Sequence, residues 1–60
     1  MIEALKEFLN TGLEIHRATR QNFIEQGKTY RSRYVAYEDG SITTIQATLS
    51  YLKQLEGINA

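Results

Sequence analysis

Apolar residues in the first half of the chain recur at intervals of three and four. They are Ile2, Leu5, Leu9, Leu13 and Phe23, with Phe8 and Ile24 widening the stripe. This spacing places them on one side of an α-helix, so the pattern predicts a helix over about 2–26. Gly27 follows, and glycine is the residue that most readily takes the left-handed conformation that ends helices.

A break in this helix near 10–12 is one reading of the local sequence. Thr11 and Glu14 are spaced as in a capping box, in which each side chain accepts the backbone N–H of the other. Gly12 costs roughly 1 kcal/mol relative to alanine inside a helix. A single bent helix is the alternative.

The pattern then changes from helical spacing to β-type residues. The segment 29–37 reads TYRSRYVAY, and tyrosine, valine and threonine favour strands. Asp39 and Gly40 follow, and Asp-Gly suits the two central positions of a type I′ turn. The sequence therefore predicts a β-hairpin over about 29–43.

A second helix is expected over about 44–56. Thr43 and Gln46 have the spacing of a capping box, and Gly57 followed by Ile58 resembles a Schellman end. A rival reading starts this helix at Ser41. The predicted fold is α+β, a single helix–β-hairpin–helix domain over 1–60 with two helices packed on a two-stranded antiparallel hairpin. The expected core contains Leu5, Leu9, Leu13, Phe23, Ile45, Leu49, Leu52 and Leu55.

The small size of the chain points to assembly. A domain of 60 residues buries only about 60% of its unfolded surface, and small domains often gain stability from disulfides, metals or oligomerisation. The chain has no cysteine and one histidine, His16, so we expect no disulfide, no metal site and no cofactor. His16 lies on the apolar side of its helix, Glu38 and Asp39 lie at the expected turn, and the chain is predicted not to be an enzyme. Without a long apolar run, no membrane association is expected.

Charge divides the chain, although its net charge is zero. Segment 17–33 holds five basic residues against one acidic residue, a net charge of +4, and the remainder carries −4. Such a division suits packing between copies or an acidic partner. The residues expected at an interface are Arg17, Arg20, Lys28, Arg31, Arg33, Tyr34, Val35, Tyr37 and Ile42.

Three parts of the chain resemble a known family. They are a leading helix ending in Gly27-Lys28-Thr29-Tyr30, a hairpin with Asp39-Gly40 at its tip, and a closing helix reading ATLSYLKQLEG. In this layout the chain resembles the small head completion, or head–tail joining, proteins of tailed bacteriophages, the family of the lambda W protein.

The resemblance implies a homo-oligomeric subunit of the virion neck. Copies would form a ring beneath the portal, extend the DNA channel, help to retain DNA and bind the next neck protein. Two other functions fit the sequence: a small dimeric regulator that binds nucleic acid, and an inhibitor or adaptor that masks a partner protein. Outside a virion, the chain would be cytoplasmic.

Overall fold

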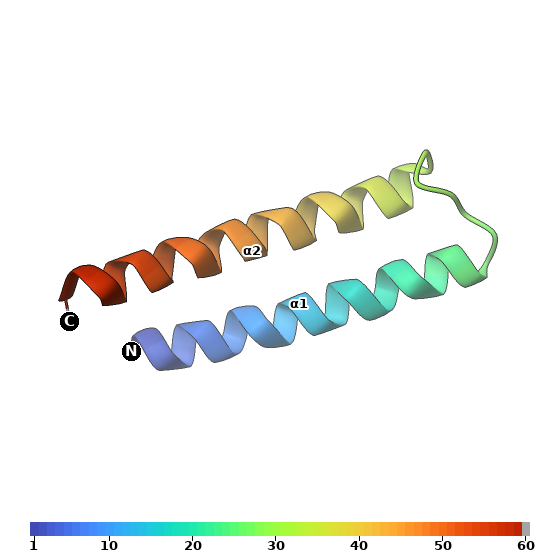
Figure 1. The fold of residues 1–60 in the computed structure, drawn as a ribbon. Coiled ribbons are helices and arrows are strands. Elements are labelled where there is room, and N and C mark those ends of the chain that lie inside the picture. Colours follow the sequence, from blue (N-terminus) through green and yellow to red (C-terminus); the bar gives the residue numbers. More distant parts are fainter. Residues whose placement is uncertain (60) are drawn as a thin grey trace.

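The protein is a hairpin of two long antiparallel helices (Figure 1). The computed structural model describes residues 1–59, with helix α1 at Ile2–Glu25 and helix α2 at Arg33–Asn59. A short loop joins them at one end of the molecule, the loop end, and both termini lie at the other, the open end. No strand occurs within residues 1–59, so the predicted α+β fold is wrong.

Helix α1 confirms the first helix predicted from the sequence, to within one residue at its end. It runs without a break through 10–12, so the single helix was the correct alternative. Gly12 lies against α2, where a Cβ atom built on it would come 3.6 Å from Ile45 Cδ1. A methyl group at this position would therefore make ordinary van der Waals contact with the Ile45 side chain.

The end of α1 is a Schellman motif, in which Gly27 is the left-handed residue that the sequence predicts. Gly27 has a φ of 91°. Its N–H donates to the carbonyl oxygen of Ile24 at 2.9 Å, and the N–H of Lys28 donates to that of Phe23 at 3.0 Å. These two bonds satisfy carbonyls that the last helical turn leaves free and direct the chain into the loop.

Ser32 caps the start of α2. Its hydroxyl oxygen accepts the N–H of Tyr34 at 3.2 Å, and its carbonyl accepts the N–H of Ala36 at 2.9 Å. Serine is among the preferred N-cap residues because its side chain satisfies one of the free N–H groups of the first turn. The helix therefore begins eleven residues before the predicted start at 44, and also before the rival start at Ser41.

The predicted hairpin over 29–43 is wrong because tertiary contacts override the local β preference. Val35, Glu38 and Ile42 recur at helical spacing and face α1, with Val35 fully buried. Asp39 and Gly40 lie inside α2 instead of forming a turn. The caps expected at Thr43 and Gly57 are also absent from α2, which continues through both residues.

The position of Gly40 gives a test of the helix against the hairpin. A Cβ atom at Gly40 meets nothing within 4 Å, so Gly40→Ala should stabilise the chain by about 0.5–1 kcal/mol through helix propensity. Urea unfolding followed by circular dichroism measures the change. Gly27→Ala is the matched control and should destabilise the chain, because its φ is left-handed. A loss of stability in Gly40→Ala would indicate a turn at this position.

The buried core between the helices is small. Leu13, Val35 and Leu52 are the buried apolar residues of the described chain. Of the expected core, Leu13 and Leu52 are buried, Leu5 is exposed, and the others are half-buried: Leu9, Phe23, Ile45, Leu49 and Leu55. The radius of gyration is 13.9 Å, against about 10 Å for a compact domain of this length. A single layer of two helices leaves much apolar surface uncovered.

Candidate functional site

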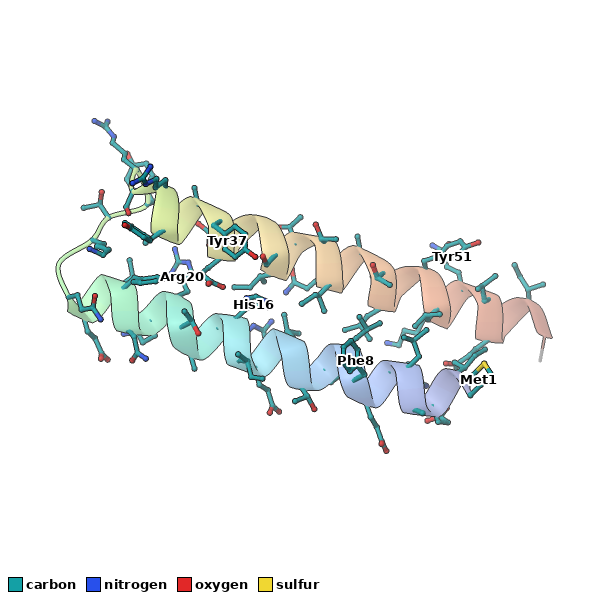
Figure 2. All side chains as sticks on the ribbon, turned by 180° about the vertical axis from the view of Figure 1, so that it is seen from behind. Met1, Phe8, His16, Arg20, Tyr37 and Tyr51 are labelled. Atoms are coloured by element: carbon teal, nitrogen blue, oxygen red, sulfur yellow. The ribbon has the colours of Figure 1, made fainter. Side chains whose placement is uncertain are left out.

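Polar pairs occupy the contact between the helices near the loop end. The imidazole of His16 donates through Nδ1 to the Glu38 side chain at Oε2, 2.5 Å away. The Glu38 side chain is only 8% exposed. One turn further along α1, Arg20 Nε donates to Asp39 Oδ1 at 2.5 Å. Figure 2 shows His16 and Arg20 lying between the two helices. These two pairs join α1 to α2 through side chains, and His16, expected on the apolar side of its helix, forms a part-buried hydrogen bond there.

A third polar contact closes the open end. Lys6 Nζ lies 2.7 Å from Glu56 Oε1 on α2 and 3.0 Å from Glu3 Oε1 on its own helix. The Glu56 Oε1 atom is enclosed, and the Lys6 ammonium is its ionic partner. Hydrogen bonding to Glu56, and then to Glu3, raises the pKa of Lys6 above its usual value.

Large exposed apolar side chains lie on one broad face of the hairpin. On α1, Met1, Phe8 and Ile15 are spaced by seven residues, beside Leu5. On α2, Tyr37 and Tyr51 are fourteen residues apart, Ile58 follows seven residues later, and Tyr34 lies beside them. Phe8 is 74% exposed and Tyr37 68%. We call this set the apolar face: Met1, Leu5, Phe8, Ile15, Tyr34, Tyr37, Tyr51 and Ile58.

The two helices present these stripes on the same side. In each helix, the exposed stripe lies beside the residues that contact the other helix, at the equivalent position of the seven-residue repeat. In an antiparallel pair of helices, equivalent positions beside the contact lie on the same side of the pair. Figure 2 looks onto this side, with Phe8 of α1 and Tyr37 of α2 drawn in front of the ribbons. A hollow on this side is lined by His16 of α1 and by α2 residues that include Tyr37, Ser41 and Thr44.

The opposite side, the polar face, is hydrophilic. Exposed residues there are Glu3, Glu7, Asn10, Glu14 and Arg17 of α1, and Thr43, Gln46, Ser50 and Lys53 of α2. A groove on this side joins both helices through Glu7 and Asn10 of α1 and Ser50 and Lys53 of α2. The hairpin is therefore amphipathic across its width, with one apolar and one polar side.

Basic and aromatic side chains gather at the loop end. The Tyr34 ring has Phe23 at 5.4 Å between centroids, Lys28 Nζ at 5.0 Å and the Arg33 guanidinium at 5.6 Å. The Arg31 guanidinium lies 5.7 Å from the Tyr30 ring. A cation placed over the face of an aromatic ring is attracted to that ring, by roughly 0.5–1 kcal/mol at exposed sites. This cluster brings together four of the residues expected at an interface: Lys28, Arg31, Arg33 and Tyr34.

The other residues expected at an interface are placed differently. Tyr37 is exposed on the apolar face, and Arg17 is exposed on the polar face. Arg20 contacts Asp39, Val35 is fully buried against α1, and Ile42 is half-buried on the same side of α2. Val35 and Ile42 therefore serve the contact between the helices.

The α1 part of the apolar face was missed by the sequence reading. Met1, Phe8 and Ile15 were assigned to no interface, although their seven-residue spacing is visible in the sequence. Such spacing beside a first apolar stripe is the signal that could have found them.

Within the described chain, no three histidine, cysteine or acidic side chains lie together as a metal site would need. Along residues 1–59, neither helix combines the length and the apolar character required to cross a bilayer.

The chain matches no protein-family model, no curated protein and no solved structure.

Proposed function

We propose that this chain is a structural subunit that binds protein through its apolar face. The observation that carries the proposal is the distribution of large apolar side chains: more of them lie exposed on this face than are buried between the helices. Contiguous exposed apolar surface on a small protein is typical of an interaction site. Tyrosine, phenylalanine and methionine, which contribute much of this face, are also enriched at protein interfaces.

A subunit of a phage neck is one form that this role would take, and it stays a prediction. The resemblance to head completion proteins was based on three segments. One of them, the hairpin with Asp39-Gly40 at its tip, is helical in this structure. The neck assignment now depends on the two flanking segments alone, whereas the binding role depends on the exposed face.

Site-specific photo-crosslinking in the cells that make the protein tests the binding role. A benzophenone amino acid at Tyr37, which is exposed on the apolar face, should give a crosslinked adduct. The same amino acid at Thr43, exposed on the polar face, is the matched control and should give none. The mass of the adduct identifies what is bound. No adduct at Tyr37, or equal adducts at both positions, would overturn the proposal.

A further inference from the structure

We infer that the apolar face binds the apolar face of a second copy, with the two loops at opposite ends, and that the pair forms an antiparallel four-helix bundle. The inference depends on the proposed function, because it identifies the protein that the apolar face binds. Three features of the hairpin support this pairing: the area of the apolar face, the charges at its two ends, and the distribution of large and small side chains over it.

The area of the face matches what a stable dimer requires. The Cα atoms extend over 46 × 17 × 11 Å, so one broad side measures about 800 Å² in projection, which is the area per partner of a standard interface. The chain exposes 4683 Å² in all, against about 4,000 Å² for a compact monomer of its size. A second two-helix layer would cover this excess and give the bundle a shared core.

The charges determine which way the second copy points. The loop-end segment 17–39 holds five basic and three acidic residues, a net charge of +2, and the rest of the chain carries −2. With the loops together, two copies of the basic cluster Lys28, Arg31 and Arg33 would share one end, which like-charge repulsion disfavours. With the loops apart, the positive end of each copy lies beside the negative end of the other.

The distribution of large and small side chains over the apolar face also favours a second copy with its loop at the opposite end. Large side chains crowd its open half, where Phe8 of α1 and Tyr51 of α2 stand exposed. The hollow in its loop half has four small residues of α2 in its lining, together with His16, Tyr37 and Ile45; the small residues are Ala36, Gly40, Ser41 and Thr44. Turning the second copy end to end sets the crowded half of each copy against the hollow of the other. Aligning the loops would instead set the two crowded halves against each other.

Mass in solution tests the dimer. Light scattering across a dilution series should give twice the chain mass for the natural sequence. Phe8→Glu with Ile15→Glu, two exposed positions on the apolar face, should give the monomer mass. Thr43→Glu with Ser50→Glu adds the same charge at exposed positions of the polar face and should leave the dimer intact. A monomer at every concentration of the natural sequence would overturn the inference, and so would a dimer unaffected by the Phe8 and Ile15 changes.

The direction of the second copy is tested without disturbing either face. The chain has no cysteine, so Gln26→Cys, at the exposed end of α1, allows one spin label at the loop end of each copy. Electron–electron distance measurement should give a separation close to the 46 Å length of the hairpin. A separation comparable with its 17 Å width would show the loops together and overturn the arrangement.

Failure of this inference can be told from failure of the binding role. A monomer in solution whose Tyr37 crosslinks to a different protein in the cell would refute the second copy and keep the binding role. A monomer that gives no adduct at Tyr37 would refute both. An adduct with twice the mass of the chain supports both together.

Discussion

Replacing His16 with alanine is expected to destabilise the hairpin by about 2 kcal/mol, since the change leaves a buried acceptor without its hydrogen-bond donor. The partner is Glu38, whose carboxylate is 8% exposed and accepts its bond from the imidazole at 2.5 Å. The carboxylate would remain enclosed between the helices without a donor. A loss of this size is a large fraction of the stability of a small domain. Thermal unfolding at a fixed protein concentration measures it.

Two further variants show whether the loss of stability in His16→Ala comes from leaving the Glu38 carboxylate without a hydrogen-bond donor. Arg20→Ala breaks the neighbouring pair with Asp39, whose side chain is 46% exposed, so water can replace the lost partner and the loss should be smaller. His16→Leu combined with Glu38→Leu removes both polar groups and should leave stability near or above that of the natural sequence. A greater loss in Arg20→Ala than in His16→Ala would contradict the buried pair.

Shortening Val35 to alanine is the second change with a large expected effect. Val35 is fully buried against α1, in a contact that has few other buried apolar side chains. Removing two methyl groups from a packed site costs their transfer to water and leaves a cavity, which together destabilise by about 2 kcal/mol. Urea denaturation gives this value from the shift of the midpoint, provided that the slope is unchanged.

Thr43→Ala is the control for Val35→Ala. Threonine has nearly the shape of valine, and Thr43 is exposed on the same helix. The same truncation there opens no cavity, and alanine has the higher helix propensity, so stability should stay the same or rise slightly. Equal losses at the two positions would mean that Val35 is not the centre of the contact.

Helix α2 shows why the sequence was misread between residues 33 and 43. A helix is recognised by apolar residues at its buried positions, but here Glu38 and Asp39 face α1 and bond to His16 and Arg20. These polar residues interrupt the apolar stripe, and the tyrosines and Asp-Gly around them favour a hairpin locally. Only the partners across the contact make a buried carboxylate tolerable, and a single sequence does not reveal them.

Helix α1 and its end could be predicted because their signals are local. Its leucines recur at helical spacing, and Gly27 takes the left-handed conformation that the sequence suggested. Tyr34 and Tyr37, two of the residues expected at an interface, are exposed. Val35 and Ile42 were expected at the same interface, but in the helix they face α1. The helix thus places Val35 in the contact with α1 and leaves the two tyrosines exposed.

Both ends of the chain leave the molecule at the open end, far from the loop (Figure 1). A domain or label attached to either end would therefore stay away from the loop-end cations. In a pair with opposed loops, the attached bodies would emerge at the two extremities, about one hairpin length of 46 Å apart. The bundle would then act as a rigid spacer that holds the attached domains of the two copies at a defined separation.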